Sequence, residues 1–173
     1  MREPKWLDVA LPVMVAVAVL WFGTFANAQG KKPLKEQVIG TWTLVSEVAY
    51  RGGQTSMPLG PNPQGQMMFD PNGRFIMIIA RPDLPKFAAG KRDAGTPEEN
   101  KAVLAGLLGF FGTYSTDEPA QVLLLRPQAG TFPNWNGADQ RRFCVMTADE
   151  MKWTNRTPAI AGEYVEVLWR RVQ

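Results

Sequence analysis

The Gly-Thr-Trp tripeptide at residues 40–42 opens the run of side chains that most constrains what this chain can fold into. From there to Tyr50 the side chains are expected to alternate between two faces, of which the mainly apolar one carries Trp42, Leu44, Ser46, Val48 and Tyr50, as in a strand with one buried face. We expect the face that carries Trp42 and Tyr50 to point inward. The pattern indicates the first strand of a small β-barrel, and the last strand offers Arg170 and Arg171 as cations that can pack on Trp42.

Strand-like segments recur along the rest of the chain with turn residues between them, which is typical of an all-β sandwich or barrel. The expected strands cover residues 41–50, 65–69, 74–81, 110–116, 121–127, 141–147, 151–154 and 163–172. A barrel with this number of strands holds side chains or one small ligand inside. The sequence therefore predicts an all-β fold, an eight-stranded antiparallel barrel.

One segment in the middle of the chain departs from this pattern. Residues 82–95 contain two prolines and two glycines and cannot form a regular strand. Thr96 then supplies a capping hydroxyl, with proline next in the chain and Glu99 three residues after the cap. These signals predict one inserted helix over residues 97–108, whose apolar face packs on the barrel as a plug. A mobile gate over a ligand site is the alternative. The apolar side chains of that face are Val103, Leu104, Leu107 and Leu108.

The first residues of the chain are typical of an export signal rather than of a folded domain. Residues 9–25 carry no charge, and an Ala-Asn-Ala triplet at 26–28 supplies the small side chains that a signal peptidase requires. An uncleaved membrane anchor is the alternative. We expect a signal peptide at 1–28, an N-terminal extension at 29–38 and a barrel domain at 39–173. The expected location is periplasmic or secreted, without stable membrane insertion after cleavage.

Histidine and cysteine usage excludes several kinds of chemistry. The chain has no histidine and one cysteine, Cys144, so it can form neither an intramolecular disulfide nor a triad or zinc site built on imidazole. Cys144 lies in an apolar run, where we expect a buried, inert thiol. The net charge of +3 is spread along the chain and does not favour nucleic acid as a partner. We expect no metal and no cofactor.

A set of motifs spread over residues 36–172 is dense enough to be specific for one family. The motifs are Gly40-Thr41-Trp42, Pro58-Leu59-Gly60-Pro61, Arg81-Pro82-Asp83, Phe87-Ala88-Ala89-Gly90, Gly95-Thr96-Pro97-Glu98-Glu99, Phe111-Gly112-Thr113-Tyr114, Phe132-Pro133-Asn134-Trp135-Asn136-Gly137 and Leu168-Trp169-Arg170-Arg171. Together they resemble the bacterial lipocalin-like domain family. The resemblance implies an eight-stranded lipocalin-like barrel with an interrupting helix and an internal cavity, and it implies a fold more than an activity.

Candidate ligand-binding residues follow from side-chain chemistry. Aromatic and amide groups on or beside the connection at 131–139 can orient a ligand in an apolar pocket, although they can equally cap the barrel end. An arginine that points into the barrel needs an anion or a carboxylate partner. For Arg142 that partner could be Glu166. The alternative, solvent exposure, is more common for an arginine in a strand. The candidates are Tyr50, Arg81, Tyr114, Asn134, Trp135, Gln140 and Arg142.

Two functional classes remain from the sequence, besides a filled barrel that serves as a structural module. The first is an exported protein that binds a small hydrophobic or amphipathic molecule in its barrel. The second is a cofactor-free isomerase, cyclase or hydrolase in the same cavity, with Tyr50, Tyr114 or Glu166 as acid or base. A carboxylate or tyrosine with a strongly shifted pKa inside the cavity would favour the enzyme.

Overall fold

The structure is a computed structural model that describes residues 32–173. The predicted signal peptide at 1–28 lies outside the described residues, as do residues 29–31 of the predicted extension. Across 32–173, none of the helices combines the length and apolar character needed to cross a bilayer.

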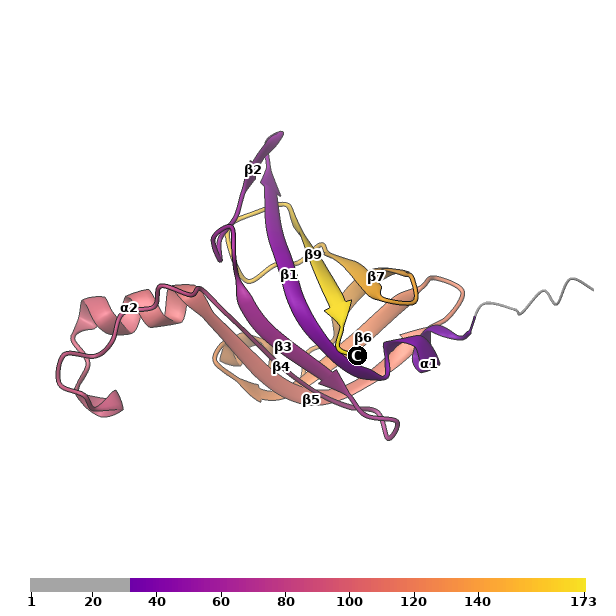
Figure 1. The fold of residues 1–173 in the computed structure, drawn as a ribbon, viewed down its shortest axis with the longest axis horizontal. Helices are drawn as coiled ribbons and strands as arrows, with labels where there is room; N and C mark the ends of the chain where they lie inside the picture. The colour runs from indigo at the N-terminus through magenta and orange to yellow at the C-terminus, as the bar shows by residue number, and fades with distance from the viewer. Residues whose placement is uncertain (1–31) are drawn as a thin grey trace, which may run out of the picture. The chain divides into compact units, whose positions relative to one another are not determined.

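A single antiparallel sheet curls into a closed barrel, in which the first and last long strands lie side by side (Figure 1). Its strands are β1 (Gly40–Arg51), β2 (Gln54–Ser56), β3 (Gln64–Phe69), β4 (Arg74–Ala80), β5 (Leu107–Asp117), β6 (Val122–Gly130), β7 (Gln140–Met146), β8 (Glu150–Asn155) and β9 (Tyr164–Arg171). Pairing of β1 with both β3 and β9 closes the ring. Strand β2 pairs only with the end of β1 among the described strands, which leaves eight strands in the barrel. The predicted eight-stranded antiparallel barrel is confirmed.

Two short α-helices accompany the sheet, α1 (Leu34–Val38) and α2 (Pro97–Gly106), with 3-10 turns η1 (Arg92–Ala94) and η2 (Pro133–Trp135). Helix α1 buries its two apolar ends, Leu34 and Val38, in the barrel core. The backbone N–H groups of Leu34 and Lys35 donate to the Glu118 carboxylate at 2.6 and 3.0 Å. This short helix is therefore fixed to the turn between β5 and β6.

Helix α2 begins as the sequence predicts but does not pack as a plug. Thr96 and Glu99 form the reciprocal capping box. The helix ends two residues earlier than expected, because Leu107 and Leu108 are the first residues of β5. Within α2 only Gly106 is buried, Leu104 is 63% exposed, and Figure 1 shows the helix extending away from the barrel. The expected packing of an apolar helix face on the barrel is therefore wrong.

A β-bulge in β1 changes which side chains face the interior. The register with β9 shifts between Leu44 and Ser46, which inserts one extra residue into β1. Before the bulge, Trp42 and Leu44 point inward as predicted. After it, the inward positions pass to odd-numbered residues, so that Glu47 lies opposite the inward Val167. The predicted inward face of β1 is therefore wrong beyond Leu44.

Trp42 anchors the α1 end of the barrel. Its side chain is fully buried, and its indole Nε1–H donates to the carbonyl of Val38 at 2.8 Å. The guanidinium of Arg171 lies 4.1 Å from the ring centroid and donates to the backbone carbonyls of Gln37 and Ile39. The predicted packing on Trp42 thus comes from Arg171, whereas Arg170 pairs with Glu150 at 3.2 Å.

Candidate functional site

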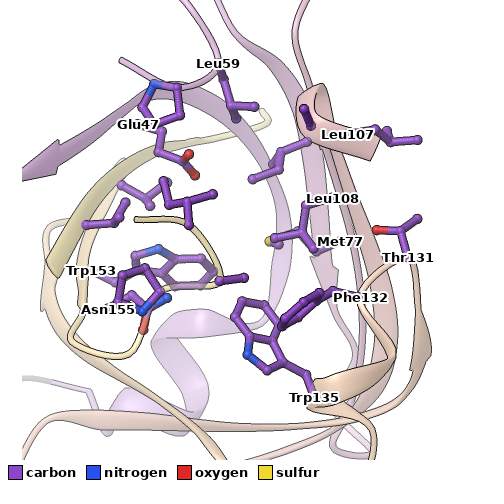
Figure 2. Close-up of a pocket in the computed structure, with 18 of the residues that line it drawn as sticks. Glu47, Leu59, Met77, Leu107, Leu108, Thr131, Phe132, Trp135, Trp153 and Asn155 are labelled. Carbon is purple, nitrogen blue, oxygen red and sulfur yellow. The ribbon is translucent and has the colours of Figure 1, made fainter. Parts of the chain in front are cut away.

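A cavity of about 340 Å³ lies inside the barrel, and its wall includes Leu104 and Ala105 of α2. Figure 2 shows this cavity with Leu107 and Leu108, the first residues of β5, on one side of it. Its volume lies near the small end of the roughly 300–1,000 Å³ found for ligand pockets. The wall is mainly aliphatic and aromatic. The apolar lining residues include Leu59, Met77, Ile79, Leu107, Leu108, Phe132, Trp135, Trp153, Val165, Val167 and Trp169. Such a wall binds apolar molecules by excluding water from their surface.

Four polar side chains other than tryptophan contribute to this wall: Glu47, Thr131, Arg142 and Asn155. Figure 2 shows the Glu47 carboxylate directed into the cavity from the side opposite Phe132 and Trp135. Two of the four, Glu47 and Arg142, are ionisable. The mostly apolar cavity wall thus carries one acidic and one basic side chain.

Arg142 enters the cavity from β7, where the alternation of inward and outward side chains runs unbroken along the strand. The side chain is only 3% exposed, and its Nη1 donates to Asn155 Oδ1 at 3.2 Å and to the Arg141 carbonyl at 3.0 Å. The guanidinium carbon lies 5.4 Å from the ring centroid of Trp135 and 5.8 Å from that of Trp153. Burial lowers the pKa of Arg142 to about 10, so the group remains a cation at neutral pH.

Glu47 reaches the cavity from β1, just after the bulge. Burial raises the pKa of its carboxyl from 4.5 to about 7, while the positive charge of Arg142 opposes part of that rise. Among residues 32–173, the ion pairs within 4.0 Å do not include Arg142, so the two charges face each other without direct contact. Because its pKa is about 7, the Glu47 carboxyl gains or loses its proton near neutral pH.

The raised pKa of Glu47 makes stability depend on pH. The folded state binds this proton more tightly than the unfolded state does, so the added stability is complete below about pH 4.5 and is lost as pH rises through about 7. We expect Glu47→Gln to remove this dependence and to raise the free energy of unfolding by about 2 kcal/mol at pH ~8. Urea unfolding at pH ~5 and ~8 tests this, with the exposed Glu98→Gln as control. Parallel pH profiles of wild type and Glu47→Gln would contradict it.

Groups behind the lining add little reactive chemistry. The Cys144 thiol is buried, and burial raises its pKa to about 12, so it stays protonated. Gln140 Oε1, behind the wall, is buried without a hydrogen-bond partner among the described residues, and so is Nε1 of Trp169, a residue that itself lines the cavity. In the same part of the chain, no cluster of three or more acidic or cysteine side chains is placed to hold a metal ion.

Two of the seven candidate ligand-binding residues line the cavity, Trp135 and Arg142. Gln140 is buried on the same face of β7 as Arg142 but is not part of the wall. Asn134 lies in η2 with its side chain exposed to solvent. A ligand-binding role for these residues stays a prediction.

The other three candidates lie away from the cavity wall, and their ligand-binding role also stays a prediction. Tyr50 stacks on Tyr164 at 4.5 Å between ring centroids. Tyr114 donates to the Asp70 carbonyl at 2.6 Å, in the turn between β3 and β4. Arg81 pairs with Asp83 at 2.7 Å.

Glu166 is not the carboxylate that faces Arg142. It pairs with Lys152 at 3.0 Å and accepts a hydrogen bond from Tyr50 at 3.1 Å. The cavity carboxylate is Glu47, which sequence reasoning missed. A signal for it existed: the apolar pair Leu44-Val45, followed by a polar residue on the expected inner face, interrupts the alternation and marks the bulge.

Comparison with known proteins gives a matching family and similar solved structures. The sequence model of a family described as "Lipocalin-like domain" matches residues 39–172. A crystal structure of an uncharacterized protein from Bacteroides eggerthii DSM 20697 is similar at 12% identity, with 78% of this chain and 99% of that chain covered and a TM-score of 0.40. The curated proteins contain no match.

Proposed function

Because the chain belongs to the lipocalin-like domain family, we propose that its barrel binds a small hydrophobic or amphipathic molecule. The observation that carries the proposal is the cavity of about 340 Å³, which combines an apolar wall with one buried cation, Arg142. An apolar wall supplies most of the binding free energy, and a few polar groups orient the ligand. A barrel with this chamber is suited to hold one small molecule.

Export belongs to the same proposal. The uncharged stretch at residues 9–25 and the Ala-Asn-Ala triplet at 26–28 support a signal peptide that directs the barrel to the periplasm or out of the cell. There the protein would carry its ligand as a free barrel, without a nucleic-acid partner and without stable membrane insertion.

Val167→Phe tests the cavity as the binding site. Val167 lies on the cavity wall, so the larger side chain occupies ligand volume. We expect the wild type to bind the neutral fluorophore N-phenyl-1-naphthylamine saturably and Val167→Phe to bind it about tenfold or more weakly. Val145→Phe is the matched control, since Val145 is 67% exposed on the outer face of β7. The proposal fails if the wild type shows no saturable binding or if Val167→Phe binds as tightly as the wild type.

A second candidate function is favoured by one observation, the raised pKa of Glu47. A general acid or base works best when its pKa lies near the operating pH, and this carboxyl has a pKa of about 7 inside the cavity. The described wall carries neither serine nor cysteine, and the hydroxyl of Thr131 accepts a hydrogen bond from the backbone N–H of Gly109 rather than pairing with a base. An isomerase that moves a proton therefore fits the wall better than a hydrolase with a covalent intermediate. Arg142 would stabilise the developing negative charge.

Isotope exchange separates the enzyme from the binder. A ligand recovered from the protein is incubated with wild type or Glu47→Gln in heavy water and analysed by mass spectrometry. An isomerase incorporates deuterium at a carbon of the ligand with wild type and not with Glu47→Gln. A ligand that returns unlabelled from both proteins would exclude the proton-transfer function and leave the binder.

A further inference from the structure

The structure assigns the cavity a charge preference: we propose that its ligand is an apolar monocarboxylic acid, whose carboxylate binds Arg142 while Glu47 takes up one proton. This inference rests on the proposed function, because it requires that the cavity hold a ligand. It adds the chemical class of that ligand and the proton that accompanies it.

The hydrogen bonds of Arg142 leave room for an acceptor. A guanidinium carries five N–H donors in a planar fork. Among residues 32–173, the hydrogen bonds of Arg142 both come from Nη1, to Asn155 Oδ1 and to the Arg141 carbonyl. Nε and Nη2 therefore have no protein acceptor in this part of the chain, although the side chain is 3% exposed. A planar carboxylate is the group whose two oxygens match two parallel N–H donors.

The surroundings of Arg142 stabilise a cation without neutralising it. Its hydrogen-bond acceptors are an amide oxygen and a carbonyl oxygen, and the aromatic faces of Trp135 and Trp153 contribute attraction through their quadrupoles. A buried charge without a contacting countercharge is unfavourable. A ligand anion seated against Nε and Nη2 supplies that countercharge, while its apolar body lies along the aliphatic wall.

The negative charge of Glu47 is the one that is neutralised, by a proton, when such a ligand binds. Arg142 on β7 is the charged group that faces it. The wall residues from the other elements around it, Val167 on β9 and Trp153 on β8, carry no charge, and neither do Leu59 and Ile160 in the loops. Cys144 lies next to Arg142 with a pKa of about 12 and remains neutral. With one cation in the chamber, a second carboxylate is unfavourable unless one of the two is protonated.

The proton balance gives the sign of the pH dependence. The ligand binds as an anion and so must be ionised, which for a carboxylic acid requires a pH above about 4–5. Above pH ~7 Glu47 is ionised in the free protein, so each binding event must add a proton to it, and affinity falls by up to about tenfold per pH unit. The affinity is therefore highest between pH ~5 and ~7.

Isothermal titration of the full mature protein with two pairs of probes tests the inference. Octanoate and 1-octanol form the acyl pair, and 2-naphthoate and 2-naphthol form the aromatic pair. Titration at pH ~8 in buffers of different ionisation enthalpy measures proton uptake, for which we expect a value approaching one for the acids and zero for 1-octanol. Preference for octanoate or 2-naphthoate then identifies the ligand as an acyl or an aromatic acid.

Variants at the two charged groups separate their roles. We expect Arg142→Met to weaken binding of the acids by roughly 10- to 150-fold while 1-octanol binding changes little. The control, Arg126→Met, removes an exposed arginine of β6 and should change neither. Glu47→Gln keeps the shape of the protonated side chain, so it should bind the acids at pH ~8 as tightly as the wild type does at pH ~6, without proton uptake.

The outcomes distinguish this inference from the proposed function. If 1-octanol binds as tightly as octanoate, without proton uptake and without an effect of Glu47→Gln, the cavity binds apolar molecules but the inference is overturned. If the wild type binds none of the four probes, the proposed function is overturned with it. Should Arg142→Met fail to fold, the proton uptake of the wild type and its loss in Glu47→Gln still decide the question.

Discussion

Replacing Trp42 with alanine is expected to lower the free energy of unfolding by about 3–5 kcal/mol. The indole is fully buried, donates to the Val38 carbonyl at 2.8 Å, and has the guanidinium of Arg171 at 4.1 Å from its centroid. It thereby joins helix α1, strand β1 and the end of β9. Truncation leaves a void in the core and removes the aromatic ring on which the Arg171 guanidinium packs while it donates to the carbonyls of Gln37 and Ile39.

Urea unfolding followed by circular dichroism measures the effect of Trp42→Ala. Thr43→Ala is the matched control, because Thr43 is the exposed neighbour in the same strand and the same pairing. We expect a large shift of the unfolding midpoint for Trp42→Ala and a small one for the control. Equal midpoints for Trp42→Ala and wild type would contradict the placement of this side chain at the barrel end.

Gly112→Ala is expected to be at least as disruptive, although it adds one methyl group. A Cβ at Gly112 would lie 2.1 Å from the carbonyl oxygen of Arg126 and 2.9 Å from the Cα of Pro127. Both contacts are with backbone, at the bulge where the pairing of β5 with β6 changes register between Phe111 and Gly112. The two strands must separate to admit the methyl group, so we expect a loss of about 3 kcal/mol or more, or a chain that does not fold.

Gly109→Ala provides the comparison within the same strand. A Cβ at Gly109 would have its nearest neighbour at 3.6 Å, which is ordinary van der Waals contact. We expect the soluble yield and unfolding midpoint of Gly109→Ala to stay close to those of the wild type, and those of Gly112→Ala to fall sharply. Equal behaviour of the two variants would show that β5 and β6 do not approach this closely at Gly112.

Much of the fold could be predicted from local sequence signals, because strands, turns and caps are determined by neighbouring residues. The capping box of Thr96 and Glu99 is of this kind. The contact of Trp42 with Arg171 is long-range, and it could be expected only because a closed barrel places its first and last strands side by side. The packing of α2 was not predictable in this way. Its apolar spacing resembles that of a surface helix, but Leu107 and Leu108 belong to the next strand, so half of the expected apolar face is not part of the helix.

The candidate site could be predicted only in part, and the limit is physical. The inward position of Arg142 follows from the alternation of side chains along β7, because this strand has no irregularity. That of Glu47 does not, because one extra residue in β1 reverses the facing of every later side chain in that strand, Tyr50 included. A bulge is determined by the pairing of distant strands, so period-two reasoning holds only up to the point where the register shifts.

Native mass spectrometry of the mature protein, purified gently from its own host, is the experiment that shows whether the barrel cavity holds a ligand. We expect a reproducible adduct that disappears on denaturation, binds to wild type and Val145→Phe, and is lost in Val167→Phe. A protein that remains bare after incubation with extracted host lipids and small acids would contradict the claim that this cavity holds a ligand. An adduct retained equally by Val167→Phe would contradict the claim that the cavity is the binding site.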